Sequence, residues 1–268
     1  MSGLVFKLRN APADRVNLGG LTPSKLAGLS DLDIERLVIG ADGVSVADIF
    51  SISGSNGGDT VTIEASSDKL DYAGAGLDAG TVVVDGSVGA YAGTGMTGGR
   101  LDIRGNAGAW LASGLSGGLI TVKGTAGDFA GAPRSGDKQG MAGGTVVIEG
   151  NVGERAGDRM RRGTIITRGT FGPAAGSRMM GGTLWTEQGF GTGPGPLLRR
   201  GTLIGPKAEH ILATYADCGA HDLVILRIMN RYFAEALGPL APKPLPANVR
   251  RYAGDLASLG KEEILLTN

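Results

Sequence analysis

The sequence contains a single cysteine, Cys218, and only two histidines, His210 and His221. One cysteine excludes an intramolecular disulfide framework and is typical of a protein in a reducing compartment. A Ser-His-Asp catalytic set is not recoverable, because both histidines lie outside the repeated region described below. Together with Cys218 the histidines could be imagined as zinc ligands, but such a set is more often incidental. We therefore predict no metal site in this chain.

Long apolar runs and an excess of charge of one sign are also missing. No segment approaches the roughly 18 consecutive apolar residues of a membrane span, and the opening MSGLVFKLRN lacks the apolar core of a signal peptide. Basic and acidic residues number 26 each, so the formal net charge is zero and does not indicate nucleic acid or an acidic membrane as a partner. We expect a cytoplasmic protein of one or two domains that binds neither nucleic acid nor a membrane.

Glycine, in contrast, is abundant at 49 residues, and its positions are periodic. A unit that begins GTVVVDGSVGAYAGTGMTG at Gly80 restarts every 19 residues. The later starts are Gly99, Gly118, Gly144, Gly163, Gly182 and Gly201; the interval from Gly118 to Gly144 is 26 because it includes a seven-residue insertion. A unit that recurs at a fixed period is one structural layer, which buries its apolar face only by stacking on its neighbours.

Within each unit, residues are numbered here from the opening glycine as position 0. Positions 2 and 4 are apolar and often β-branched, as in Val82 and Val84, which predicts a short strand. Glycines recur at positions 6 and 9, which indicates corners where φ is positive or where two backbones approach closely. We predict an all-β fold, a right-handed parallel β-helix of 19-residue turns, with neighbouring strands about 4.8 Å apart.

Stacked turns place like positions next to each other, so three positions should form ladders. Position 5 alternates in charge at four of its five steps: Asp85, Arg104, Lys123, Glu149, Arg168, Glu187. Position 11 begins with three aromatic residues: Tyr91, Trp110, Phe129. Position 16 is Met or Leu throughout: Met96, Leu115, Met141, Met160, Met179, Leu198. Met141 matches only when the insertion is left out, which supports the alignment.

Residues 1–57 are predicted to form an N-terminal cap for the open end of the stack. Thr22 and Pro23 indicate the start of a short helix that runs to about Leu29. Strands are expected at residues 37–39 and 44–52. The glycine-rich β-helix is assigned to residues 58–205, with an irregular first turn that opens at Val61.

Residues 206–268 are predicted to form a C-terminal helix and an extended tail. Apolar residues at helical spacing from Asp222 to Leu237, followed by Gly238 and Pro239, predict one helix. The segment APKPLPA at residues 241–247 is typical of an extended connector, and residues 264–266 could form a strand. We expect the tail to pack along the stack or to reach a neighbouring polypeptide.

The later turns carry the candidate site, a corner rich in arginine. Arg159 and Arg178 share position 15, so they should stand above one another at the corner that the insertion, residues 133–139, enters. Arg199 and Arg200 follow in the next turn. Stacked arginines suit carboxylate or phosphate groups, but they equally suit a protein interface, which we favour over a small anionic ligand. No pair of acidic residues is spaced for acid–base catalysis, so no catalytic residue is predicted.

Beyond these patterns, the sequence resembles a known family. The glycine-rich units, the entry LTPSKLAG and the ending RRYAGDLASLGKEEIL resemble the C subunit of formylmethanofuran dehydrogenase, most closely its homologue in the bacterial formyltransferase/hydrolase complex. The likeness covers nearly the whole chain. The large chain of glutamate synthase carries a related glycine-rich β-helix, but the length, the cap and the tail favour the C-subunit family.

The resemblance implies a non-catalytic, β-helical protein that assembles with the A, B and D subunits of the same complex. The A subunit is amidohydrolase-like with a metal site, and the D subunit is a formyltransferase. Such a complex transfers formyl from formyl-tetrahydromethanopterin to a methanofuran-type carrier and releases formate. The resemblance places the carrier and the metal in the partner subunits and assigns no cofactor to this chain.

Three alternatives remain open at this stage. The chain could belong to an archaeal-type tungsten or molybdenum formylmethanofuran dehydrogenase, although arginine outnumbers lysine 18 to 8, which leans toward a GC-rich bacterial genome. It could be a module in which Arg159, Arg178, Arg199 and Arg200 bind the anionic tail of the carrier. A β-helical acyltransferase is disfavoured, because those enzymes use turns of about 18 residues.

Overall fold

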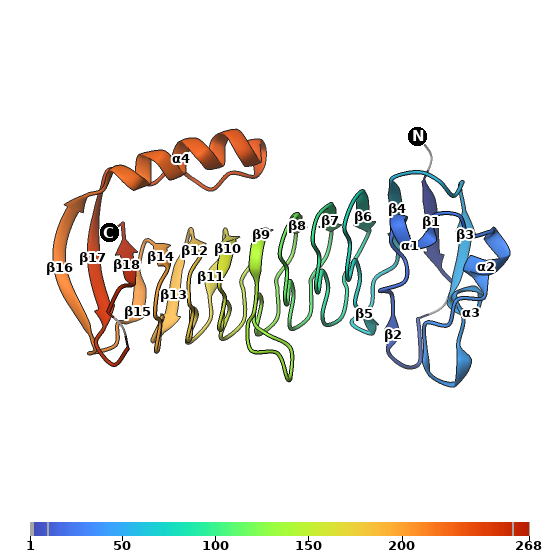
Figure 1. Ribbon diagram of the computed structural model, residues 1–268, viewed down its shortest axis with the longest axis horizontal. Coiled ribbons are helices and arrows are strands. Elements are labelled where there is room, and N and C mark those ends of the chain that lie inside the picture. Colours follow the sequence, from blue (N-terminus) through green and yellow to red (C-terminus); the bar gives the residue numbers. More distant parts are fainter. Residues whose placement is uncertain (1–2, 10, 259, 268) are drawn as a thin grey trace.

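A computed structural model describes residues 3–9, 11–258 and 260–267; Met1, Ser2, Asn10, Leu259 and Asn268, which fall in the predicted cap and tail, lie outside it. The described residues are β-rich: their strands form one sheet of 13 strands, one of three and one of two, and helices are few. The repeated units lie side by side as a row of turns between the N-terminal and C-terminal segments (Figure 1). Within the described residues, no helix is long and apolar enough to cross a membrane.

Short strands alternate with longer stretches of corners and turns along the chain. The strands before the tail are β1 (Leu4–Leu8), β2 (Val16–Asn17), β3 (Phe50–Ser53), β4 (Thr60–Glu64), β5 (Leu70–Asp71), β6 (Thr81–Val84), β7 (Arg100–Ile103), β8 (Leu119–Val122), β9 (Ala142–Ile148), β10 (Arg162–Thr167), β11 (Thr170–Phe171), β12 (Thr183–Thr186), β13 (Gly189–Thr192) and β14 (Thr202–Gly205). The tail holds β15 (Ala208–His210), β16 (Tyr215–Asp222), β17 (Asn248–Asp255) and β18 (Glu263–Leu266). The helices are α1 (Pro23–Leu26), α2 (Asp31–Glu35), α3 (Val46–Ile49) and α4 (Val224–Leu237), with 3₁₀ turns at Ala41–Gly43 and Gly238–Leu240.

The pairing register of the large sheet follows the 19-residue alignment. Strands β4, β6, β7, β8, β9, β10, β12 and β14 are neighbours in this order, and each of these pairs is parallel. Position 2 pairs with position 2 at every step, including Ile120 with Val146 across the insertion. The insertion therefore changes the loop and leaves the strand register intact. Val61 pairs with Val82, which confirms the predicted irregular first turn.

The core between the turns is built from the positions predicted to face inward. Positions 2, 4 and 16 are buried throughout, and all six Met and Leu residues at position 16 are fully buried. The glycine at position 6 is needed for close approach: a Cβ on Gly105 would lie 2.5 Å from the carbonyl carbon of Gly86 in the turn before. Of the two predicted reasons for these glycines, close backbone approach is therefore the one that applies at Gly105.

Both side-chain ladders are present on the outside of the stack. Tyr72, Tyr91, Trp110 and Phe129 stack face to face, with ring centroids 5.0, 5.3 and 5.1 Å apart. The charged ladder forms ion pairs between Arg104 and Asp85, Lys123 and Glu149, and Arg168 and Glu149. Glu187 instead pairs with Lys243 of the tail. The ladders confirm that like positions stand above one another.

The N-terminal segment differs from the expectation in three places. Helix α1 begins at Pro23 as predicted but ends at Leu26, three residues early. The predicted strand 44–52 is wrong in its first half, where α3 forms because the Asp48 carboxylate accepts hydrogen bonds from the Ser45 backbone N–H at 2.8 Å and the Ser45 hydroxyl at 2.7 Å. Residues 37–39 make only an isolated bridge, Val38 to Ser45. Strand β1, which pairs with β3 and β4, joins this segment to the main sheet.

The C-terminal tail packs back on the stack, as expected. Strand β18 pairs in parallel with β14 and confirms the predicted strand, while the antiparallel pairs of β16 with β17 and β17 with β18 were not predicted. Helix α4 starts at Val224, two residues later than predicted, and lies along the outer face of the large sheet (Figure 1). There Leu226 and Phe233 pack against Ile166 and Trp185, which occupy position 3 of their units.

Candidate functional site

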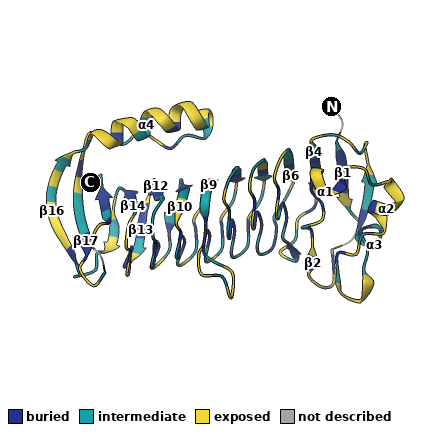
Figure 2. Cartoon of the chain, viewed as in Figure 1, coloured by how far each residue is buried: buried dark blue, intermediate teal, exposed yellow. Residues whose placement is uncertain are grey.

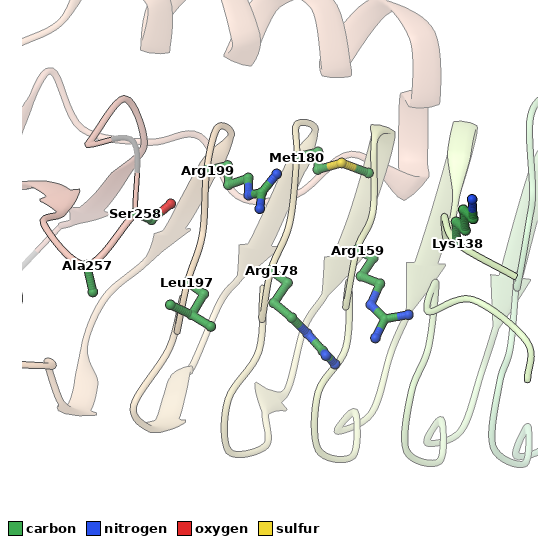
Figure 3. A pocket seen from close by; sticks show the side chains of 8 residues that line it. All are labelled: Lys138, Arg159, Arg178, Met180, Leu197, Arg199, Ala257 and Ser258. Carbon is green, nitrogen blue, oxygen red and sulfur yellow. The ribbon is translucent and has the colours of Figure 1, made fainter. Parts of the chain in front are cut away.

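The repeat brings two of the four predicted arginines to one corner. Arg159, Arg178 and Leu197 occupy position 15 of three consecutive units and line up along the row of turns (Figure 3). Their φ angles are 50°, 52° and 56°, in the left-handed region that glycine adopts most easily. Earlier units use Gly95 and Gly114 there, with φ of 65° and 67°. The same corner therefore carries glycine in the early turns and large side chains in the later ones, despite the backbone strain.

The corner opens into a cavity of about 520 Å³. It is lined by side chains from three sources, the position-15 corner, the insertion and the tail, and these are Lys138, Arg159, Arg178, Met180, Leu197, Arg199, Ala257 and Ser258 (Figure 3). The structure thus brings Arg159, Arg178 and Arg199 together at one cavity. Arg200 is exposed and does not line the cavity, so the structure does not bring it together with the other three arginines.

Arg178 forms an ion pair with a buried carboxylate, that of Asp158. Arg178 donates from Nε and from one terminal nitrogen to the two oxygens of Asp158, each at 3.0 Å. Asp158 is only 5% exposed, and Arg155 and Arg159 lie 3.8 and 3.9 Å from its oxygens. A bidentate pair of this kind holds the guanidinium in a fixed orientation. Arg178 therefore anchors the corner, and its charge is largely balanced by Asp158.

The remaining cations leave the cavity positively charged. Among the described residues, no ion pair involves Lys138 or Arg199, and Arg159 has only its 3.9 Å contact. No acidic side chain lines the cavity within the described part of the chain. Met180, Leu197 and Ala257 add an apolar portion. The arrangement suits a ligand with several negative charges on a hydrocarbon backbone.

The C-terminal tail supplies one wall of the cavity, next to the turn that carries Leu197. The buried Asp255 accepts hydrogen bonds from the Leu197 N–H at 2.7 Å and from the Ala257 N–H at 3.0 Å. Glu262, also buried, accepts one from the Asp255 N–H. These bonds fix the tail loop against the corner. Sequence reasoning missed Ala257 and Ser258, because their contact is long-range; the shared position 15 of Leu197 could have identified that residue.

The histidines lie in the tail, away from the cavity lining. His221 lies on β16, with its Nε2 3.0 Å from the Cys218 carbonyl oxygen, and His210 lies on β15. In the part of the chain that the structure describes, no group of three or more His, Cys, Asp or Glu residues could hold a metal ion. The described lining of the cavity offers cations, the Ser258 hydroxyl and apolar groups.

Comparisons with known proteins give a consistent result. No family model matches the chain. A curated relative, the C subunit of the formyltransferase/hydrolase complex Fhc of Methylorubrum extorquens, is 41% identical over 86 residues, a segment that spans 31% of this chain and only 32% of that relative. The crystal structure of the formyltransferase/hydrolase complex (FhcABCD) from Methylorubrum extorquens with methylofuran contains a chain that is 39% identical, with a TM-score of 0.91.

That second likeness extends over the whole molecule, since it covers 98% of this chain and 99% of the other. It includes the cap and the tail as well as the glycine-rich turns, the same three parts on which the sequence resemblance depends. Identity and coverage at this level establish common descent and a common fold, and the chain therefore belongs to the family of the C subunit of the formyltransferase/hydrolase complex.

Proposed function

We propose that the chain is the non-catalytic structural subunit of a formyltransferase/hydrolase complex and that it assembles with counterparts of the A, B and D subunits. The observation that carries this proposal is the match over 98% of the chain to a protein in the crystal structure of FhcABCD. The complex transfers formyl from formyl-tetrahydromethanopterin to a methanofuran-type carrier and releases formate. Among the two branches of the family, the likeness favours this complex over the archaeal-type dehydrogenase.

The described residues support a structural role. In the part of the chain that the structure describes, the cavity lining contains no carboxylate, histidine or cysteine that could act as an acid, base or nucleophile. Thirteen of the described strands form one extended sheet, and a rigid sheet of this length offers several separate faces to partners. We assign the metal to the partner subunits and the carrier to their active sites, and we place the complex in the cytoplasm.

The architecture that best accounts for this sheet is a right-handed parallel β-helix. Its support is the unbroken parallel pairing from β4 to β14, together with the second parallel set, β11, β13 and β15, which continues the bridges of Ala107, Ala126 and Val152 at position 8. Two parallel sheets at fixed positions of one repeat are what successive turns of a helical chain path produce. An electron-density map of the assembled complex would test it, and a left-handed path or separate sheets would refute it.

Native mass spectrometry of the tagged protein, purified gently from its own host, tests the function. We expect one large complex that also contains an amidohydrolase-like subunit and a formyltransferase-like subunit. Recovery of a lone monomer or homotrimer, with both other subunits present in the lysate, would refute the structural role and would point to the acyltransferase alternative.

A second proposal concerns the arginine cavity, which we assign to the anionic tail of the carrier. The supporting observation is that Lys138, Arg159 and Arg199 surround a cavity of about 520 Å³ without an acidic side chain in its described lining. A flexible chain of carboxylates could neutralise these cations while its hydrocarbon portion contacts Met180 and Leu197. Held here by its tail, a carrier could serve partners that dock on different faces of the chain.

The structure shows which variants test this second proposal without disturbing the fold. Lys138→Glu and Arg199→Glu reverse cations that make no ion pair in the described residues, whereas Arg178→Glu would leave Asp158 buried next to a like charge. We expect both variants to bind a synthetic oligoglutamate at least about tenfold more weakly at low salt, with assembly intact. Arg36→Glu, in the cap, is the matched control and should bind normally. Unchanged oligoglutamate affinity in both reversed variants would refute the assignment.

A further inference from the structure

Helix α4 is apolar on two sides, and only one of them is used within the chain. Its inner side buries Leu226 and Phe233, and the Phe233 ring meets the Trp185 ring edge-on at 5.3 Å. Its outer side exposes four large apolar residues, with exposed fractions of 49 to 62%: Val224, Ile225, Ile228 and Tyr232. Figure 2 shows how little of α4 is buried compared with the strands below it. We call the set Ile225, Ile228 and Tyr232 the α4 flank.

The connector after α4 shows which way this flank faces. The side chain of Asn230 is hydrogen-bonded to both the N–H and the C=O of Leu245, so the connector runs along the Asn230 side of the helix. Ile228 and Tyr232 are each two residues from Asn230, which places them about 200° around the helix. The connector itself is anchored near the ends of the strands, where Glu187 pairs with Lys243. The α4 flank therefore faces the side on which the strands begin.

A row of small polar residues and two free arginines lie on that side. Position 1, where the strands start, is a half-buried threonine in four neighbouring units: Thr145, Thr164, Thr183 and Thr202. At the start of β10 and just before β14, Arg162 and Arg200 are exposed, and no ion pair among the described residues includes either of them. Position 18 is glycine in the earlier units, so these arginines are additions to the repeat.

The dimensions of this surface match one more helix. Ile166 and Ile204 pack against α4, and Arg162 and Arg200 each lie four residues before one of them. Along a strand, four residues span about 13 Å, so each arginine lies about 13 Å from the residue that packs against α4. Packed helices lie about 8–10 Å apart, so a second helix beside α4 would rest on the threonine row with its far side at the arginines. The row spans β9 to β14, and a helix of roughly 10–14 residues would cover it at about 1.5 Å per residue.

We propose that the α4 flank, the threonine row and the pair Arg162 and Arg200 form the docking surface for an amphipathic helix of a partner polypeptide, with its apolar side against α4 and acidic residues toward the arginines. The proposal rests on the structural role proposed above and goes beyond it by naming the surface and the chemistry of its occupant. Apolar anchors at spacing i, i+3, i+7 recognise a helix, and the unpaired cations select an acidic one.

Charge argues against a second copy of this chain as the occupant. The charged residues of α4 already pair locally, Arg227 with Asp222 and Arg231 with Glu235. A second α4 in this place would therefore offer no free carboxylate to Arg162 and Arg200, and this lack of charge complementarity favours a different partner.

The experiment uses the chain co-expressed with the A, B and D subunits encoded by the same genome, with the photo-crosslinking residue p-benzoylphenylalanine in place of Ile228. We expect the crosslink to join this position to an acidic, amphipathic helical segment of one partner subunit. A crosslink to a second copy of this chain, to a basic or non-helical segment, or no crosslink in an assembled complex would overturn the proposal while leaving the structural role in place. Failure of the unmodified four subunits to assemble would refute the structural role, and the docking surface with it.

Matched variants give an independent measure. The double variant Ile228→Glu with Tyr232→Glu adds charge only at exposed positions and should weaken the crosslinked partner's binding at least about tenfold, as should Arg162→Glu with Arg200→Glu. Ala234→Glu adds the same charge on the connector side of the same helix and should leave binding unchanged. Wild-type affinity in both double variants, or an equal loss with Ala234→Glu, would also overturn the proposal.

Discussion

Arg159 occupies a left-handed backbone conformation that earlier units fill with glycine, and this difference predicts the effect of one substitution. Replacing Arg159 by glycine should make the protein more stable, although it removes a side chain from the candidate site. The φ of 50° strains any residue that carries a Cβ, whereas Gly95 and Gly114 adopt φ of 65° and 67° at the equivalent position. The lost contact is weak, because the Arg159 guanidinium lies 3.9 Å from Asp158 and its side chain is 39% exposed.

The magnitude follows from two opposing effects. Relief of left-handed backbone strain is worth about 1–2 kcal/mol. The greater freedom of glycine in the unfolded chain offsets about 0.5–1 kcal/mol of this. The net gain of about 0.5–1 kcal/mol corresponds to a rise in melting temperature of about 1–4 °C for a chain of this size.

Thermal unfolding followed by circular dichroism measures this effect, with Arg159→Ala as the control. Alanine removes the same charge but keeps the Cβ and therefore the strain, so Arg159→Gly should melt higher than both the wild type and Arg159→Ala. Both variants should lose affinity for oligoglutamate equally if the cavity binds anions. Equal melting temperatures of the glycine and alanine variants would refute the strain argument, since the two differ only in the Cβ.

Three further perturbations test the core, the aromatic ladder and the tail. Ile148→Asp places an unpaired charge at a fully buried position and should abolish cooperative unfolding in calorimetry, whereas Ile148→Val should lower the free energy of unfolding by only about 1 kcal/mol. Wild-type-like melting of the aspartate variant would show that position 4 does not face inward. Trp110→Ala removes two ring stacks and should lower the free energy of unfolding by about 1–3 kcal/mol in chemical denaturation, while Trp110→Tyr should retain most of the stability. An equal loss of stability in both variants would show that ring stacking does not stabilise the fold. Burial, and then the nearby Glu262 and Asp255, raise the pKa of the Tyr215 phenol above its ordinary value of 10.0, so the folded state favours the neutral phenol. The contribution of the neutral phenol to the stability of the fold is therefore complete below pH 10, and it is lost as the pH rises above 10 and the unfolded chain loses the proton. The melting temperatures of the wild type and Tyr215→Phe should therefore converge between pH 7 and about pH 11, and a constant difference would contradict the pKa shift.

The repeated part of the fold could be predicted in detail because its information is local. Each unit specifies its strand by alternation, and the fixed period then specifies which residues are neighbours, so the register across the insertion followed from Met141 alone. The same reasoning brought Arg159 and Arg178 to one corner. It could also have paired Arg178 with Asp158, since they occupy positions 15 and 14 of adjacent units.

The two ends could not be predicted equally well, since their structure depends on long-range contacts and on single capping interactions. In the cap, one carboxylate, Asp48, converts part of an apparent strand into a helix. In the tail, the pairing of β16 with β17 joins segments separated by the whole of α4, and no pattern in either segment indicates the other. The wall formed by Ala257 and Ser258 has the same origin. Arg200 lies apart from the cavity although Arg199 lines it, because adjacent residues at a strand start point to different sides.

Because the units stack regularly, the number of units in the sequence determines the length of the molecule. Each 19-residue unit adds about 4.8 Å to the row of turns, so the number of units between the cap and the arginine cavity sets the distance between these two parts of the surface. Inserting one extra unit at Gly99 would leave the contacts inside every unit unchanged. It would increase the distance between the cap and the cavity by one strand spacing, and a partner that contacts both would no longer fit. In the proposed complex, the length of the row of turns would thus set the spacing between the docked partners.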